Sequence, residues 1–226
     1  MYFDIYYLVL VVPAILLSMF AQAKVTSTFS KFSKKASQSG ITGEQAARRI
    51  LDANGLNHIR IERIAGNLTD HYDPKANVIR LSDSVYDKPT IAAAGVAAHE
   101  AGHAVQHSTN YAPIRWRNMV LPVASIGSQA AIPLAILGLI MGFEPLVTAG
   151  IFLFAAVVVF QLVTLPVEFD ASKRATAILD EWGLLNQAEI KGVKKVLGAA
   201  ALTYVAAALS SLMNLLRLIL LSRRDD

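Results

Sequence analysis

The 226-residue chain contains no cysteine, and only 17% of its residues are charged. Without cysteine, disulfide bonds and thiolate metal ligands are excluded. Hydrophobic residues make up 54% of the sequence, so the chain is more apolar than a soluble domain of this length. The charges gather in two stretches, residues 24–117 and 168–195, with long apolar runs around them. This block pattern predicts several membrane spans that are separated by polar segments.

A basic stripe with interleaved base-stacking aromatic residues is also missing from the sequence. The formal net charge of +4 could by itself suggest a nucleic-acid partner. The lysines and arginines, however, flank the apolar runs, where basic residues commonly border a membrane. We therefore expect the lipid bilayer as a partner and exclude nucleic acid.

Four apolar runs are long enough to cross a bilayer, which takes about 20 helical residues. The first run carries Asp4 near its start and no lysine or arginine before it, so we expect a retained anchor; the alternative is a signal peptide cleaved after Ala23. The last run contains Asn214 and Arg217, so its end is expected to face protein or the interface. These runs are residues 2–23, 119–143, 146–167 and 196–221.

The polar residues between the first two runs predict a small α+β region. Thr42, with Gln45 three residues later, forms a capping box that begins a short helix. Nearly alternating isoleucines predict one strand, and a short apolar segment predicts another after a turn cluster. These elements are the helix at residues 42–54, the strands near 59–64 and 78–81, and the turn at 70–77. A further helix is expected from Thr90 to His107, with Pro89 in its first turn.

Residues 24–35 are basic, and Phe29 and Phe32 are interleaved with the lysines. Two interpretations of this segment stay open. It is either a helix end that lies at the level of the lipid headgroups or a solvated linker.

The motif His99-Glu100-Ala101-Gly102-His103 carries the chemistry of the chain. On a helix, residues four apart share a face and lie about 6 Å apart along the axis, so both imidazoles can bind one tetrahedral zinc ion. Glu100 lies on a neighbouring face, where it can take a proton from a zinc-activated water. The alternative is a pair of ordinary surface histidines.

A hydrolytic zinc site needs a third protein ligand. His107 is excluded by geometry, because it would lie about 12 Å along the helix from His99. Glu168 is the better candidate, since the hairpin of the second and third apolar runs returns the chain to the membrane face of the motif. Asp170 stays open as the alternative ligand, or as an acceptor for an imidazole N–H.

The strand before the predicted metal helix suggests where an extended substrate could bind. We expect residues 78–81 to lie beside the metal cleft, as the edge strand that binds a peptide by strand addition. His71 and Tyr72 would then lie near the site, in contact with the substrate or with a metal ligand. The alternative is that they belong to a purely structural turn.

At these residues the sequence resembles the YugP-like membrane zinc metallopeptidases of bacteria, and more distantly those of the HtpX type. The resemblance implies zinc binding by His99, His103 and Glu168, with Glu100 as catalytic base. In the distant relatives an aspartate follows the ligand glutamate by four residues, where this chain has Ser172. The order of the apolar runs also matches. The matching segments are residues 70–74, 81–86, 98–107 and 167–172.

Together these patterns predict a mainly α-helical membrane protein, with about four transmembrane helices and a small α+β zinc-peptidase domain at one membrane face. The expected function is a zinc-dependent metalloendopeptidase of gluzincin-like type that cleaves peptide or membrane-protein substrates. The alternative is a zinc-binding membrane protein without hydrolytic activity. Basic residues beside the spans predict a site on the cytoplasmic face of a bacterial cell membrane. The expected regions are the anchor at 1–23, the zinc-binding α+β region at 24–118, the hairpin at 119–167, the third-ligand segment at 168–195 and the last helix at 196–226.

Overall fold

The computed structural model describes residues 4–222, which are mainly helical and form two compact units. The apolar unit comprises Met1–Gln22, Ala112–Pro166 and Leu202–Asp226. The polar unit comprises Ala23–Tyr111 and Val167–Ala201. Four helices have the length and composition to cross a membrane, and a small three-stranded sheet is present, so the predicted fold class is confirmed.

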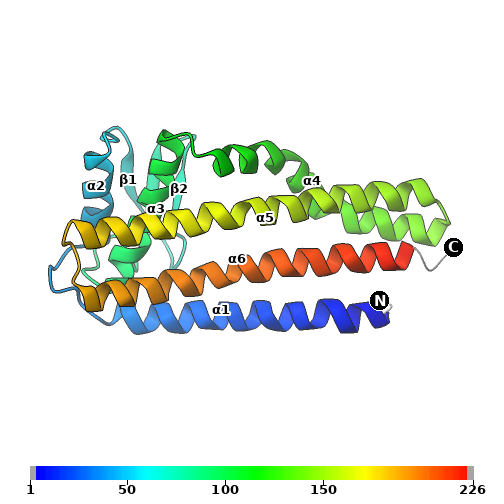
Figure 1. Cartoon of the computed structure of the whole chain (residues 1–226), viewed down its shortest axis with the longest axis horizontal. Helices are drawn as coiled ribbons and strands as arrows, with labels where there is room; N and C mark the ends of the chain where they lie inside the picture. Colours follow the sequence, from blue (N-terminus) through cyan, green and yellow to red (C-terminus); the bar gives the residue numbers. More distant parts are fainter. Residues whose placement is uncertain (1–3, 223–226) are drawn as a thin grey trace. The chain divides into compact units, whose positions relative to one another are not determined.

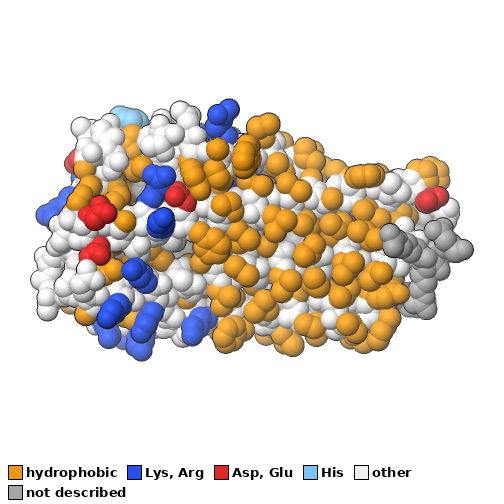
Figure 2. Space-filling view, viewed as in Figure 1, with side chains coloured by type: hydrophobic (Ala, Val, Ile, Leu, Met, Phe, Trp, Pro, Cys, Tyr) orange, Lys and Arg blue, Asp and Glu red, His pale blue; other side chains and the backbone are white. Residues whose placement is uncertain are grey.

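The apolar unit is built from α4 (Ala112–Met141) and from parts of three other long helices, whose remaining residues belong to the polar unit (Figure 1). A short π-helical segment, η1 (Tyr7–Val11), leads into the first of them. Large apolar side chains such as Leu16, Phe20 and Phe152 are more than half exposed, and side chains of this kind cover the visible face of these helices (Figure 2). Such a surface is stable in lipid and costly in water. The helices are α1 (Val12–Ser33), α4 (Ala112–Met141), α5 (Glu144–Glu181) and α6 (Gln187–Ser222).

Small residues allow α4 and α5 to pack closely within the apolar unit. A Cβ atom built at Gly127 would lie 2.4 Å from the carbonyl oxygen of Leu153, and one at Gly150 would lie 2.7 Å from that of Ala131. This is the common way for membrane helices to approach each other, because close contact strengthens dispersion attraction. α4 bends along its length (Figure 1), as expected for a helix with internal prolines such as Pro122.

An ion pair links Asp4, which precedes η1, to α6 within the apolar unit. The guanidinium of Arg217 donates to the carboxylate of Asp4 at 2.6 Å, and the two side chains are only 16% and 13% exposed. The guanidinium also lies over the ring of Tyr7. The prediction that the end of the last run faces protein is therefore confirmed at Arg217. Arg223 and Arg224, which follow it, lie outside the described residues.

In the polar unit, α2 (Gly43–Ala53) packs against α3 (Ile91–Ser108). The predicted capping box is confirmed, since Thr42 accepts from the backbone N–H of Gln45 and the Gln45 side chain accepts in return. Thr90 caps α3 by accepting from the N–H of Ala93, so Pro89 precedes the cap and is not in the first turn as predicted. α3 is rich in alanine and buried on most sides, which makes it the central helix of this unit.

The sheet corrects two predictions about the residues before α3. Its strands are β1 (Arg60–Ile64), β2 (His71–Asp73) and β3 (Val78–Ser82), in the order β1-β3-β2. β3 pairs with β1 in parallel and with β2 in antiparallel orientation. The prediction that residues 78–81 form an edge strand is therefore wrong, because ladder bonds use both sides of β3. The prediction that residues 71–73 belong to a turn is also wrong, because they form the short edge strand β2.

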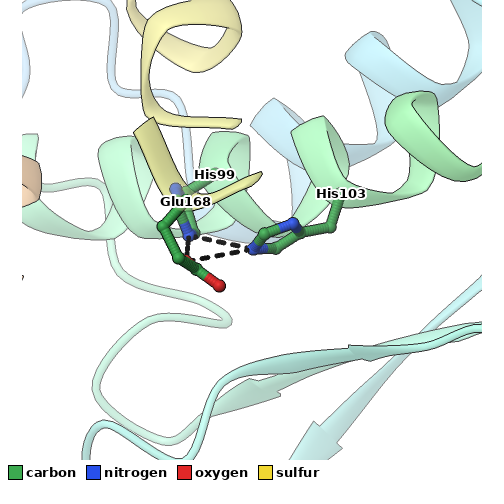
Figure 3. A group of neighbouring side chains, drawn as sticks. All are labelled: His99, His103 and Glu168. Carbon is green, nitrogen blue, oxygen red and sulfur yellow. Dashed lines mark hydrogen bonds and ion pairs between the residues drawn. The ribbon is translucent and has the colours of Figure 1, made fainter. Parts of the chain in front are cut away.

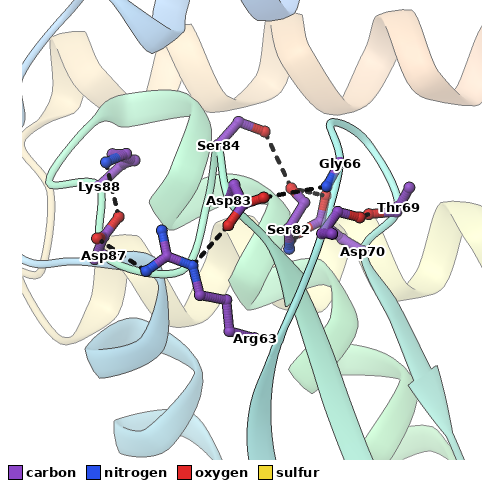
Figure 4. A network of polar contacts seen from close by, with 10 residues as sticks. Arg63, Gly66, Thr69, Asp70, Ser82, Asp83, Ser84, Asp87 and Lys88 are labelled. Atoms are coloured by element: carbon purple, nitrogen blue, oxygen red, sulfur yellow. Dashed lines mark hydrogen bonds and ion pairs between the residues drawn. The ribbon is translucent and has the colours of Figure 1, made fainter.

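Side-chain contacts fix the loops at one end of the sheet (Figure 4). Asp70, just before β2, accepts from the backbone N–H and the hydroxyl of Ser82 at the end of β3. Arg63 on β1 donates to Asp83, which also accepts from the N–H of Gly66. At the other end, Asp73 accepts from the N–H groups of residues 75 and 76 and so closes the β2–β3 turn.

The basic segment at residues 24–35 is part of α1 up to Ser33, so the interpretation as a linker is wrong. Phe29 and Phe32 are buried in the core of the polar unit, where Phe32 packs on Gly192 of α6. The aromatic rings therefore do not lie at lipid headgroups. The exposed lysines on this part of α1 and on the start of α6 form a basic surface (Figure 2).

Candidate metal centre

Two helices of the polar unit bring three metal-binding side chains together (Figure 3). His99 and His103 lie one turn apart on α3, and Glu168 projects from α5. The two Nε2 atoms are 3.1 Å apart, and Oε2 of Glu168 lies 3.3 Å from that of His99 and 3.5 Å from that of His103. The imidazoles are 13% and 14% exposed and the carboxylate 5%, so the group is close to but not sealed from solvent.

These three distances fit a tetrahedral zinc ion. Zinc binds imidazole nitrogen and carboxylate oxygen at about 2.0–2.2 Å, and tetrahedral angles then place the ligand atoms about 3.3–3.5 Å apart. The observed separations of 3.1, 3.3 and 3.5 Å lie close to this range. Three protein ligands would leave a fourth position open, as in catalytic zinc sites.

The carboxylate of Glu168 gives independent support for a cation. Its Oε2 atom is buried and accepts no hydrogen bond from the described residues. A buried carboxylate oxygen without a donor or a cation is strongly unfavourable. The two neighbouring atoms are imidazole nitrogens, which can serve as ligands through their lone pairs. A metal ion between them would supply the missing positive charge.

Further contacts orient both imidazoles, and sequence reasoning missed most of them. Nδ1 of His99 lies 3.2 Å from the hydroxyl of Ser172, and Nδ1 of His103 lies 3.0 Å from Oε1 of Gln106. Asp170 contacts neither imidazole; it accepts from Gln106 at 2.8 Å and from Arg174 at 2.6 Å. In the distant relatives an aspartate stands at the position of Ser172. This correspondence could have indicated from the sequence that Ser172 contacts a metal ligand.

Gly102, inside the histidine motif, permits the approach of α3 to α5. A Cβ atom built there would lie 3.0 Å from the carbonyl oxygen and 3.4 Å from the Cα atom of Ala171. Both are backbone atoms, which cannot turn aside as a flexible side chain would. The glycine therefore sets how near Glu168 comes to the two histidines.

Glu100 is buried on α3 and makes no hydrogen bond or ion pair with the residues that the structure describes. Burial, the largest single effect on His103, lowers the pKa of that imidazole, but the contact with Glu168 and the charges of Glu100 and Glu168 raise the pKa overall. The two carboxylates thus favour positive charge at His103, as they would favour a bound cation. The charge of Glu100 therefore acts on a member of the group of three without belonging to the group.

Comparison with known proteins agrees with this geometry. Residues 7–223 match the family described as "Putative neutral zinc metallopeptidase". The chain belongs to this family. A protein of Bacillus subtilis (strain 168) named "Putative membrane protease YugP" is 49% identical over 222 residues, which cover 97% of this chain and 99% of that protein. No solved structure matches. Zinc is accordingly the cofactor of the family, and the protein is a membrane protein with four apolar helices.

A cavity of about 340 Å³ in the polar unit is lined by two of the residues that the sequence analysis discussed. Tyr72 and His107 line it with their rings 5.6 Å apart in edge-to-face contact, and His58 lines it as well. His107 is not part of the metal group, as helix geometry predicted. His71 lies at the sheet instead, where Nδ1 is 2.8 Å from the carbonyl oxygen of Thr69 and Nε2 is 3.4 Å from Arg80.

Proposed function

We propose that this protein is a membrane-bound, zinc-dependent metalloendopeptidase. The observation that carries the proposal is the group of His99, His103 and Glu168 at ligand spacing, with the buried carboxylate of Glu100 close enough for its charge to act on His103. A zinc ion held there would polarise the scissile carbonyl and lower the pKa of a coordinated water to about 7. Family membership supports zinc and peptide substrates.

The roles of the chain's own residues follow from their positions. His99, His103 and Glu168 would hold the metal and leave one position open. Glu100 would act as general base, because no hydrogen bond or ion pair within residues 4–222 engages its carboxylate, which can then accept the proton of the attacking water and pass it to the leaving amine. General-base catalysis of this kind contributes about 10²–10⁴-fold to turnover.

The edge strand for an extended substrate would be β2. It pairs with β3 on one side only, so its other side offers backbone donors and acceptors. Tyr72, in the middle of β2, lines the cavity together with Ala104 and His107 of α3. A substrate side chain could enter this cavity while the peptide backbone pairs with β2. His71 and Tyr72 would then contact the substrate as elements of a strand.

The test is peptide hydrolysis by the purified protein in detergent or nanodiscs, with Glu100→Gln beside it. We expect the variant to bind one zinc per chain and to lose about 10²–10⁴-fold in turnover. Hydrolysis at the normal rate by Glu100→Gln would disprove the role of the base. A protein that binds zinc and cleaves no peptide in either form would be the alternative, a zinc-binding membrane protein without hydrolytic activity.

We further propose that the site faces the cytoplasm of a bacterial cell. Basic residues border the spans on the chain segments that carry the site, whereas the opposite side would have Glu144 at the start of α5 and, after the last span, only Arg223 and Arg224. A topology reporter fused at residues 142–145 should therefore report the outer side of the membrane. A cytoplasmic signal from this fusion would reverse the assignment. The basic residues are Lys24, Lys31, Lys34, Lys35, Arg115, Arg117, Lys173, Arg174, Lys191, Lys194 and Lys195.

A further inference from the structure

Gln106 is a fully buried polar side chain on α3, one turn after His103. A buried amide needs partners for its oxygen and for its two N–H groups. Nε2 lies 2.8 Å from the carbonyl oxygen of Val167 and 2.8 Å from Oδ2 of Asp170, both on α5. Oε1 lies 3.0 Å from Nδ1 of His103. The amide therefore connects a metal-site histidine to the residue directly before Glu168 and to the residue two positions after it on α5.

The partners of Gln106 determine which way its amide points. A carbonyl oxygen and a carboxylate oxygen only accept hydrogen bonds, so the end that faces Val167 and Asp170 must be the NH₂ group. The opposite orientation would place one oxygen against two others. The oxygen of the amide therefore faces His103, and because it only accepts, Nδ1 of His103 must carry the hydrogen.

We propose that Gln106 is a positioning residue, which holds His103 in the Nδ1–H form and aims its Nε2 lone pair at the metal. In a neutral imidazole with the hydrogen on Nδ1, Nε2 carries the free lone pair. That atom faces Nε2 of His99 and Oε2 of Glu168. The proposal rests on the metal group described above and not on hydrolysis.

The two histidines differ in how firmly they are held. His99 contacts the hydroxyl of Ser172, which can both donate and accept and therefore imposes no tautomer. Behind Gln106, by contrast, Asp170 is itself fixed by Arg174 at 2.6 Å, and the guanidinium of Arg174 lies over the ring of Tyr111. The orientation of the Gln106 amide is thus fixed by a series of further contacts, whereas the hydroxyl of Ser172 can rotate about its C–O bond.

The experiment measures the zinc dissociation constant of each variant by chelator competition. Gln106→Leu removes the acceptor, and we expect zinc to bind about 10–100-fold more weakly, the usual effect of losing a partner of a metal ligand. Ser172→Ala is the matched control at the other histidine and should lose less. A larger loss for Ser172→Ala than for Gln106→Leu would overturn the assignment.

A conservative variant separates positioning from a general structural role. In Gln106→Glu, one carboxylate oxygen can still accept from Nδ1–H of His103, while the other replaces the NH₂ group that donates to Val167 and Asp170. We therefore expect this variant to be less stable than the wild type but to bind zinc within about 10-fold of the wild-type affinity. An affinity reduced by about 100-fold or more would contradict the proposal, and this comparison with the wild type holds even if Gln106→Leu does not fold.

Thermal unfolding with and without zinc supplies the second readout. If Gln106 positions His103, Gln106→Leu should lower the stabilisation that added zinc confers, since that gain depends on the dissociation constant. If Gln106 is only structural, the metal-free and zinc-loaded proteins should lose the same amount, with the zinc affinity unchanged, and the proposal would be wrong. Glu100→Gln, which tests hydrolysis, should show normal affinity and normal stabilisation by zinc.

Discussion

Glycine brings two pairs of helices together, one pair in each unit, and the two contacts differ in what else they contain. In the apolar unit, Gly127 of α4 faces the backbone of Leu153, and the nearest side chain is the apolar Val157. In the polar unit, Gly102 of α3 faces the backbone of Ala171, and directional polar contacts lie on both sides. The first contact serves packing alone, whereas the second also sets the spacing of metal ligands.

The two units also differ in how they compensate a carboxylate that is largely shielded from solvent. In the apolar unit, Asp4 has a protein cation, Arg217, at 2.6 Å. In the polar unit, Oε2 of Glu168 is buried with no hydrogen-bond donor from the described residues. Since a buried charge without compensation is strongly unfavourable, the first carboxylate is explained by the chain and the second calls for an ion from outside.

The largest expected effect is loss of the metal from Glu168→Ala. Removing one of three protein ligands should lower zinc from one per chain to none at micromolar zinc, as measured by metal analysis after gel filtration. Asp170→Asn, which keeps an acceptor for Gln106, should weaken zinc binding by at most about 10–100-fold. His107→Ala should leave the stoichiometry near normal. Full zinc in Glu168→Ala together with none in Asp170→Asn would exchange the roles of the two carboxylates.

The carboxylate of the apolar unit should behave in the opposite way. Arg217→Leu leaves Asp4 without its cation, and we expect a loss of about 2 kcal/mol in the free energy of unfolding, with no effect on zinc stoichiometry. Adding Asp4→Asn to this variant should recover part of the loss, because both charges are then gone. Denaturation in mixed micelles measures the three variants. If the double variant were less stable than Arg217→Leu, the unpaired charge of Asp4 would not be the cause of the lost stability.

The glycine contacts predict a graded series of alanine variants. Gly127→Ala places a Cβ atom 2.4 Å from a carbonyl oxygen and should destabilise by about 1–3 kcal/mol, whereas Gly102→Ala meets one at 3.0 Å and should cost less. Gly102→Ala should in addition weaken zinc binding, because it moves α3 from α5. Gly198→Ala on α6 is the control, since nothing lies within 4 Å, and should stabilise by about 0.5–1 kcal/mol. Equal unfolding temperatures for all three would refute the argument from close approach.

The contrast between units also explains what the sequence could predict. The apolar runs, the capping box at Thr42 and the spacing of His99 and His103 are local patterns, and local patterns are visible in a single sequence. Glu168 could be named only because the hairpin of apolar runs returns the chain to the motif. The metal-ligand assignment itself stays a prediction until zinc is measured.

The features that sequence reasoning missed depend on tertiary contact. Gln106 looks like any glutamine in a helix, and only α5 reveals its partners. β2 has three residues and the composition of a turn, so its pairing with β3 outweighs local preference. β3 is the central strand because the strand order in the sheet, β1-β3-β2, differs from the order along the chain. The residue pattern at positions 78–81 contains no information about that order.

The smallest expected effect concerns two aspartates of the loop network in the polar unit. Burial raises the pKa of Asp70, despite its hydrogen bonds from Ser82, and the charge of Glu100 adds to this. The hydrogen bond from Arg63 lowers the pKa of Asp83. Folded Asp70 therefore binds its proton more tightly than the unfolded chain does, and folded Asp83 binds its proton less tightly.

The two aspartates should consequently respond to pH with opposite signs. The stability that Asp70 contributes is complete below the unfolded pKa, about 3.9, and is lost as pH rises through the folded value. Asp70→Asn does not titrate, so its free energy of unfolding should improve relative to the wild type as pH rises from about 3 to about 7. Asp83 contributes stability above about pH 3.9 that is lost on acidification through its lower folded pKa, so Asp83→Asn should worsen relative to the wild type over the same rise. Denaturation of both variants across this range gives the slopes, and slopes of the same sign would show that burial does not dominate at Asp70.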